Sequence, residues 1–125
     1  MNLKKTIQDF YNHFEKMDIE GIVPFFASHA TVESPTLGKM EARPFYRELF
    51  SKTKRLKTHI KDIFINPDNP HRAAVLGSLS WETKQGDTTN LESVVIFEFN
   101  AQGKIEMARI IYDAHHAREA FRKVG

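Results

Sequence analysis

The fold is decided by residues 91–99, LESVVIFEF. Side chains in this stretch alternate between two faces, as they do along a β-strand. One face carries Ser93, Val95, Phe97 and Phe99. The opposite face carries Glu92, Val94, Ile96 and Glu98. The first face is suited to a protein core, whereas the second is half apolar, so neither face is wholly polar.

Three further stretches alternate in the same way and flank the first one. They cover residues 56–65, 73–83 and 104–112. Short segments rich in Gly, Asn, Asp and Pro separate the stretches, at residues 66–70, 85–87 and 100–103. Strands that are joined by such short turns pair antiparallel. The second half of the chain is therefore predicted to form a meander of long antiparallel strands.

In the residues that precede the meander, apolar side chains are spaced as they are along a helix. Apolar side chains recur in steps of four, three, four and three, at Leu3, Ile7, Phe10, Phe14 and Met17. This spacing places one apolar stripe along a helix. Asp18 is expected to cap a second, shorter helix, and Pro24 to end or bend it. The inward face of that second helix would hold Ile19, Ile22, Val23 and Phe26.

A short strand and a third helix are predicted next. Residues 30–34 alternate and are rich in β-branched side chains, and Pro35 ends them before a loop at residues 36–39. Pro44 suits the first turn of a third helix. We expect this helix to turn three side chains inward, namely Phe45, Leu49 and Phe50. From Ala114 the chain is helix-permissive, which predicts a short terminal helix that packs Phe121 inward.

These elements predict an α+β fold. Helices that precede an antiparallel sheet must cover one of its faces, and a strongly twisted sheet can curl around them. We therefore expect three N-terminal helices in the concave face of a curved sheet, followed by a short C-terminal helix. A length of 125 residues suits a single domain spanning residues 1–125.

The composition excludes several classes of function. The net charge is +2, from 18 basic and 16 acidic side chains, so no strong field recruits nucleic acid or an anionic membrane. The chain has no cysteine, which excludes thiolate catalysis, disulfides and cysteine-ligated zinc. Ten Phe against one Trp and three Tyr indicate a demand for flat, wholly apolar surface.

The expected location is the cytoplasm. The first ten residues are amphipathic and lack the continuous apolar run of a signal peptide. No apolar stretch approaches the ~20 residues that a membrane-spanning helix needs.

Several local motifs, together with the order of elements, resemble the nuclear-transport-factor-like superfamily, in particular its ketosteroid isomerase and polyketide cyclase (SnoaL-like) branches. The motifs are Asp18-Ile19-Glu20-Gly21-Ile22-Val23, Phe26-Ala27, Ala30-Thr31-Val32-Glu33-Ser34-Pro35, Phe97-Glu98-Phe99-Asn100, Gly103-Lys104-Ile105 and Arg109. The resemblance spans nearly the whole chain. It implies a cone-shaped roll whose helices cap a strongly curved sheet and leave a deep cavity for a hydrophobic molecule, usually within a homodimer.

The residues that the resemblance assigns to steroid isomerisation are replaced. The position of the carboxylate base, directly before the proline of the first strand, holds Ser34. The helix-one tyrosine position holds Phe10, with Tyr11 beside it, and the position of the protonated aspartate holds Val95. A hydroxyl needs its own base to abstract a proton, and valine donates no hydrogen bond. Steroid isomerisation by the family's mechanism is therefore not expected.

The cyclase branch, and the related epoxide hydrolases, imply a different acidic residue. They place a carboxylate after an aromatic at the end of the last strand, a few residues beyond an arginine, and Arg109-Ile110-Ile111-Tyr112-Asp113 matches this arrangement. Asp113 is the leading catalytic candidate, as a general acid or base whose pKa burial would raise. The alternative is that Asp113 caps the terminal helix.

The expected cavity gives two main hypotheses of function. The first is a cofactor-independent isomerase, cyclase or hydrolase that uses an acidic residue. The second is a noncatalytic protein that binds a small hydrophobic ligand, and a weaker third is a protein-interaction module. The expected cavity-lining residues are Phe10, Tyr11, Phe14, Phe26, Glu33, Ser34, Trp81, Val95, Phe97, Arg109 and Tyr112. Two of these residues have a second interpretation. Glu33 can face solvent beside its strand, and Arg109 can pair with a carboxylate.

Other partners receive little support. The six histidines lie on separate elements or, at His115 and His116, project about 100° apart on a helix, so we expect no metal site. The only basic cluster, residues 52–61, lacks interleaved aromatics and is better explained as a solvated strand face than as a nucleic-acid site. No cofactor is expected. The half-apolar outer sheet face favours a homodimer as one interpretation and ordinary surface as the other.

Overall fold

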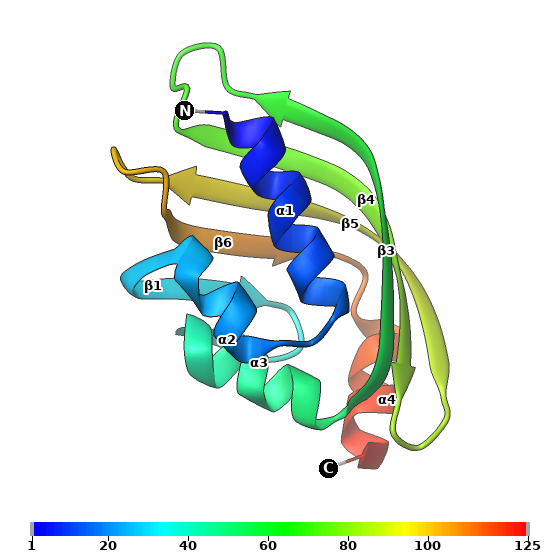
Figure 1. Ribbon diagram of the computed structural model, residues 1–125. Helices are drawn as coiled ribbons and strands as arrows, with labels where there is room; N and C mark the ends of the chain where they lie inside the picture. Colours follow the sequence, from blue (N-terminus) through cyan, green and yellow to red (C-terminus); the bar gives the residue numbers. More distant parts are fainter. Residues whose placement is uncertain (1, 125) are drawn as a thin grey trace.

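The computed structural model describes residues 2–124 and has the predicted α+β class (Figure 1). Helices α1, α2 and α3 precede or interrupt the first strands, and helix α4 closes the chain. Their bounds are Leu3–Glu15 for α1, Ile19–Ile22 for α2, Ala42–Ser51 for α3 and His115–Val124 for α4, with a 3-10 helix, η1, at Val23–Phe25. In the part of the chain that the structure describes, no helix is long and apolar enough to cross a membrane.

The sheet is strongly curved and has the strand order β2-β1-β6-β5-β4-β3. The strands are β1 Phe26–Ser34, β2 Gly38–Glu41, β3 Thr53–Ile65, β4 Arg72–Thr83, β5 Thr88–Phe99 and β6 Ile105–Ile111. Strands β3 to β6 pair antiparallel in chain order, which confirms the predicted meander. Strand β1 pairs parallel with β6, so that β1 and β2 extend the sheet beyond the meander.

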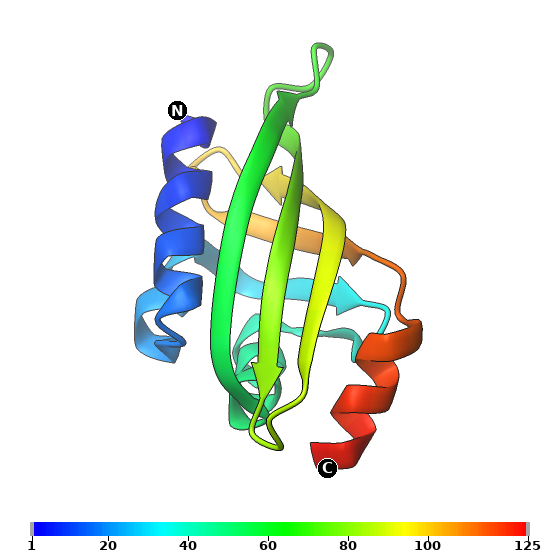
Figure 2. The same cartoon turned by 90° about the vertical axis from the view of Figure 1, so that its right-hand side faces the viewer.

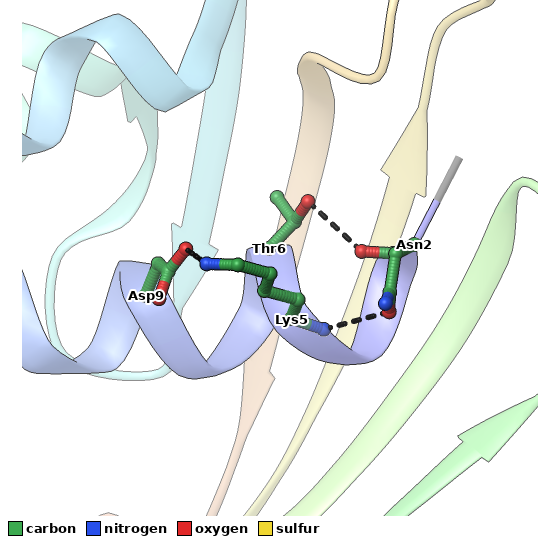
Figure 3. A network of polar contacts seen from close by, with 4 residues as sticks. All are labelled: Asn2, Lys5, Thr6 and Asp9. Atoms are coloured by element: carbon green, nitrogen blue, oxygen red, sulfur yellow. Dashed lines mark hydrogen bonds and ion pairs between the residues drawn. The ribbon is translucent and has the colours of Figure 1, made fainter.

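Helix α1 confirms the stripe that the sequence predicts. Its buried side chains are Leu3, Ile7, Phe10 and Phe14. Asn2 caps the start of the helix, and its side-chain oxygen accepts the backbone N–H of Lys5 at 3.0 Å (Figure 3). The Lys5 ammonium donates to Asp9 one turn later, at 2.8 Å. The Asn2 contact satisfies an N–H that the helix itself cannot pair and so fixes where α1 starts.

Helix α1 crosses the concave face of the sheet, and Figures 1 and 2 show the long strands β3, β4 and β5 bending past it. At its last residue, the Glu15 carboxylate accepts both the N–H and the hydroxyl of Thr58 on β3, at 2.5 and 2.6 Å. Helix α3 packs against β1 and β3 on the same side. The core therefore lies between the early helices and the hollow of the sheet, as predicted.

The first strands differ from the sequence-based prediction. Strand β1 begins at Phe26 rather than at residue 30, because its register with β6 shifts between Phe26 and Thr31. His29 has φ 61° within this irregular part, and such a bulge breaks the alternation from which a strand is recognised. The segment that was expected to be a loop contributes strand β2, which begins at Gly38 and pairs with β1.

The outer face of the sheet carries an apolar patch. Cross-strand pairing places Phe64, Ala74, Ile96 and Arg109 in one row and Asp62, Leu76, Val94 and Ile111 in the next. Phe64 and Ile111 are the most open, at 56% and 45% exposure. We call Phe64, Leu76, Val94, Ile96 and Ile111 the outer patch. Ion pairs border it, at Arg72–Glu98 and Lys61–Glu92.

Candidate functional site

A cavity of about 110 Å³ lies between the concave face of the sheet and helices α1, α3 and α4. Nearly all of its wall is apolar, and most of the polar groups are hydroxyls. The lining residues are Phe10, Tyr11, Phe14, Ser34, Thr36, Leu37, Phe45, Tyr46, Leu49, Thr58, His59, Ile60, Val75, Gly77, Ser78, Leu79, Trp81, Leu91, Ser93, Val95, Phe97, Ala108, Ile110, Tyr112, Ala117 and Phe121. The wall thus combines residues from the sheet with residues from helices α1, α3 and α4.

Phe10 lies at the centre of the aromatic wall. Its ring centroid is 5.2 Å from that of Tyr11, 5.6 Å from that of Phe97 and 6.3 Å from that of Tyr46. All three pairs are edge-to-face, the arrangement that aromatic quadrupoles favour. This packing fixes the two tyrosine rings against side chains that are themselves buried.

The hydroxyls of Tyr11 and Tyr46 have no hydrogen-bond partner among residues 2–124. Within the same part of the chain, Thr83 Oγ1 is the side-chain polar atom that is fully enclosed without a partner. The hydroxyl oxygens of Tyr11 and Tyr46 are not among the fully enclosed atoms. Both oxygens therefore remain accessible, although Tyr46 as a whole is only 2% exposed. Because both residues line the cavity, the space that their hydroxyls reach is the cavity itself.

Burial changes the acidity of both phenols. It raises the pKa of Tyr11 well above the ordinary value of 10.0. It likewise raises the pKa of Tyr46, and the nearby Tyr11 adds to that shift. A phenol with a raised pKa stays protonated at neutral pH and can donate its hydrogen. The cavity thus holds two neighbouring, neutral donors that the protein leaves unused.

A second polar cluster surrounds Tyr112, which follows β6. The Tyr112 hydroxyl forms a short hydrogen bond with Thr36 Oγ1. Ser34 Oγ accepts the backbone N–H of Leu37 at 3.0 Å, which holds the β1–β2 turn in place. Burial raises the pKa of Tyr112, against opposing hydrogen bonds from Thr36 and Ser34 and the positive charge of Arg118. We call Ser34, Thr36 and Tyr112 the rim hydroxyls.

Helix α4 lies beside the β4–β5 turn (Figures 1 and 2) and forms part of the cavity wall. Ala117 and Phe121 form its contribution to the wall. The Phe121 ring lies 5.4 Å from the Trp81 ring on β4, and the Lys52 ammonium lies 4.9 Å from its centroid. The indole N–H of Trp81 donates to Thr53 Oγ1 at 2.8 Å, so this anchor is itself held in place.

Most of the lining residues that the sequence predicts are brought together here. Those that line the cavity are Phe10, Tyr11, Phe14, Ser34, Trp81, Val95, Phe97 and Tyr112. They come from α1, from β1, β4 and β5, and from the segment after β6. Periodicity accounts for those that lie on the apolar face of an element, such as Phe10, Phe14 and Phe97, whereas Ser34 and Tyr112 were expected here from the resemblance.

Three predicted lining residues lie elsewhere. Phe26 is buried, but its ring packs 5.8 Å from Phe10 and 5.7 Å from Tyr46, behind the cavity wall. Glu33 is exposed, because it alternates with the buried Val32 and Ser34 along β1. Arg109 is Glu33's partner in the parallel register and is exposed with it on the outer face.

Asp113 is exposed and does not belong to the cavity wall as described. Its Oδ1 accepts the backbone N–H of His115 at 3.2 Å, at the start of α4. The contact joins residues two positions apart, as in an Asx-turn, and lies just before α4, whose first residue is His115. The catalytic role that the resemblance implies for Asp113 stays a prediction.

Sequence reasoning missed Tyr46, and it predicted that Phe121 packs inward from the terminal helix without assigning it to the cavity wall. Helix α3 begins at Ala42, and Tyr46 lies one turn before Phe50, which was expected to point inward. The i, i+4 spacing of these two aromatics is the signal that could have identified Tyr46. Thr36 was expected in a loop, and nothing local indicates that its hydroxyl meets Tyr112, 76 residues later.

Charged groups are scarce in the wall. Among the described lining residues there is no Asp, Glu, Lys or Arg, and His59 is the one ionisable group besides the tyrosines. Residues 2–124 contain no cluster of three or more His, Cys, Asp or Glu side chains that could hold a metal ion. The arrangement can therefore enclose an apolar molecule and donate hydrogen bonds to it.

Comparisons with known proteins agree with this architecture. An NTF2-like protein of unknown function from Burkholderia pseudomallei K96243 superposes with a TM-score of 0.82 at 16% identity, over 97% of this chain and 98% of that one. The epoxide hydrolase/cyclase-like enzyme SalBIII, from pyran ring formation in salinomycin, gives a TM-score of 0.77 at 17% identity, over 89% and 90%. At these sequence identities, both comparisons show only that the fold is similar.

A curated relative by sequence is the ribonucleoside-diphosphate reductase large subunit of variola virus, 27% identical over 97 residues. The match covers 75% of this chain, but only 13% of the reductase. So small a part assigns none of the reductase's activity to this chain.

A match to a family model shows to which family this chain belongs. The model of the SnoaL-like domain matches residues 7–107, which run from α1 through β6 and include most of the cavity wall. The chain belongs to the SnoaL-like domain family.

Proposed function

We propose that this protein binds a small, largely apolar molecule whose carbonyl or hydroxyl oxygen accepts hydrogen bonds from Tyr11 and Tyr46. The observation that carries the proposal is the pair of buried phenols that line the cavity and have no partner among the described residues. A buried donor without a partner costs about 1–3 kcal/mol, so a ligand oxygen that satisfies it is favoured.

The size of the cavity limits the ligand. A dry apolar cavity of about 150 Å³ accepts one benzene molecule. The cavity of about 110 Å³ is smaller, so it suits at most one ring, and any further group of the ligand has to extend to the open rim of the cavity. A steroid skeleton would not fit unless the wall moved. We take an aromatic ketone as the simplest molecule of the right size and chemistry.

Binding is favoured over an isomerase, cyclase or hydrolase reaction. Each of those reactions needs an acid or base beside the reacting atom. In the part of the chain that the structure describes, no carboxylate lines the cavity. Ser34, which stands at the base position of the steroid isomerases, instead accepts an N–H from Leu37. Hydroxyls alone support recognition of an oxygen better than proton abstraction.

A matched pair of probes tests the proposal. Acetophenone and α-methylstyrene have the same shape, but only acetophenone has a carbonyl oxygen. Two-dimensional NMR titration should show that both probes shift amides around the cavity and that acetophenone binds about tenfold more tightly, the value of one net hydrogen bond. The Tyr11→Phe/Tyr46→Phe double variant should remove that preference and leave the affinity for α-methylstyrene as an internal control. Equal affinities in the wild type, or no binding of either probe, would contradict the proposal.

We also propose that the protein forms a homodimer through its outer sheet face. The outer patch supports this, because its side chains lie on four neighbouring strands and two of them, Phe64 and Ile111, are about half exposed. Contiguous apolar surface of this kind is typical of interfaces, and a two-fold axis would bury the same patch on both copies.

A further inference from the structure

We propose that Arg118 and the rim hydroxyls form an anion subsite at the edge of the cavity, so that the ligand is an aromatic carbonyl compound with a carboxylate group. This inference rests on the proposed function, because it assigns the second end of the same ligand. It adds the chemical class of the ligand and the residue that selects it.

The backbone holds the Arg118 guanidinium beside the rim. Nε and Nη2 of Arg118 both donate to the carbonyl oxygen of Pro35, at 3.3 and 3.0 Å. The residue after Pro35 is Thr36, whose hydroxyl meets that of Tyr112. Ala117, directly before Arg118, lines the cavity. The guanidinium therefore lies where α4, the β1–β2 turn and the end of β6 come together.

The charge of Arg118 is not neutralised by the protein. Arg118 forms no ion pair with a carboxylate among residues 2–124. Other arginines do form such pairs, since Arg43 contacts Glu20 at 2.6 Å and Arg72 contacts Glu98 at 2.5 Å. Two of the N–H donors of Arg118 point to Pro35, which leaves the Nη1 group available.

The rim hydroxyls complete the subsite. The Arg118 guanidinium and the Tyr112 hydroxyl contact neighbouring residues of the β1–β2 turn, Pro35 and Thr36 respectively, and the positive charge of Arg118 opposes the rise that burial causes in the pKa of Tyr112. Ser34, Thr36 and Tyr112 all line the cavity. A carboxylate at this point would accept from Arg118 and from a rim hydroxyl, and charge-assisted hydrogen bonds are about twice as strong as neutral ones. A ligand without a negative charge at this end would form no charge-assisted hydrogen bond with Arg118.

The experiment compares acetophenone with 3- and 4-acetylbenzoate, which keep the ring and the ketone and add a carboxylate. Affinities are measured by NMR titration of the full chain at low ionic strength. The better benzoate isomer should bind about tenfold more tightly than acetophenone. Because Arg118 is exposed, added salt should reduce this ratio.

Two variants identify the cation. Arg118→Gln keeps a donor for the Pro35 carbonyl and removes the charge, so the ratio of the two affinities should fall to about one. Arg122→Gln is the matched control, because Arg122 is an exposed arginine one turn later on α4, and it should keep the wild-type ratio.

The outcomes separate the two proposals. If acetophenone binds and neither benzoate binds more tightly, the anion subsite is wrong and the proposed function stands. If the preference persists in Arg118→Gln, or disappears equally in Arg122→Gln, Arg118 is not the selecting residue and the inference is overturned. If no probe binds, the proposed function fails first and the subsite falls with it.

Discussion

The ring of Trp81 on β4 lies 5.4 Å from the ring of Phe121, and this contact seats helix α4 against the end of the cavity. Few other elements touch α4, whose main neighbours are β4 and β5. A terminal helix with few contacts opens more easily than the sheet that it covers. The ring pair is therefore expected to stabilise α4 together with the hydrogen bonds from Arg118 to Pro35.

Phe121→Ala tests the contribution of the ring pair. We expect amide hydrogen exchange in α4 to accelerate by about tenfold or more, because the variant removes the ring that packs on Trp81, while the central strands keep their protection. Arg122→Ala, on the exposed side of the same helix, should leave exchange unchanged. Equal protection of α4 in Phe121→Ala and the wild type would show that another contact seats the helix.

The buried tyrosines predict a loss of stability at high pH. Burial raises the pKa of Tyr11, Tyr46 and Tyr112, so the folded chain holds these protons more tightly than the unfolded chain. Their contribution is fully present below the unfolded value of 10.0. As the pH rises above it, the unfolded chain releases the protons first and the free energy of unfolding falls.

Urea unfolding at several values between pH 8 and pH 11 measures this effect, and the Tyr46→Phe variant isolates it. That variant should lose less stability over the range than the wild type does. Near neutral pH its stability should be close to that of the wild type, because the Tyr46 hydroxyl has no partner among the described residues to lose. Identical pH dependence in the two proteins would argue against a buried, neutral phenol at residue 46.

Asp113 provides a test of its position at the start of α4. Asp113→Ala should lower the free energy of unfolding by about 0.5–1.5 kcal/mol, because it removes the acceptor for the His115 N–H, whereas Asp113→Asn should lower it less. Thermal or urea unfolding of the two variants checks this. Neither change should alter the affinity for acetophenone, since the side chain is exposed. A large loss of affinity in Asp113→Asn would instead place the carboxylate in the cavity, as a catalytic role requires.

The outer patch predicts the oligomeric state. The wild type should sediment as a dimer, and Ile96→Lys should shift it to a monomer, because a charge in the centre of a shared apolar patch would have to be desolvated. Glu119→Lys, an exposed site on α4, is the control and should remain dimeric. A monomeric wild type at high concentration would leave the patch as ordinary surface.

At Gly77, strand β4 lies too close to β3 for a side chain. A Cβ atom at this position would lie 2.7 Å from the backbone oxygen of His59, a contact that backbone cannot relieve cheaply. Gly77→Ala should therefore cost about 1–3 kcal/mol of stability, as overpacking does. Gly38→Asn is the control, since Gly38 has φ +72° and nothing within 4 Å of its added Cβ. Equal urea midpoints for the two variants would contradict the close approach.

Local periodicity determined much of this fold. The stripe from Leu3 to Phe14 and the alternation in residues 91–99 specify which face of each element is apolar, and the structure buries those faces. Such patterns depend only on neighbours along the chain, so they survive without knowledge of the fold. They therefore predicted the helices, the long strands, the α+β class and the aromatic part of the cavity wall.

Tertiary structure alone decided the polar part of the site. The bulge near His29 sets the register of β1, and that register exposes Glu33 with Arg109 while it turns Ser34 inward. The contacts of Thr36 with Tyr112 and of Arg118 with Pro35 join residues 76 and 83 positions apart. Their geometry depends on how the sheet curves and where α4 comes to rest. No local pattern encodes this, because each hydroxyl or cation gains its role only from a partner that packing brings to it.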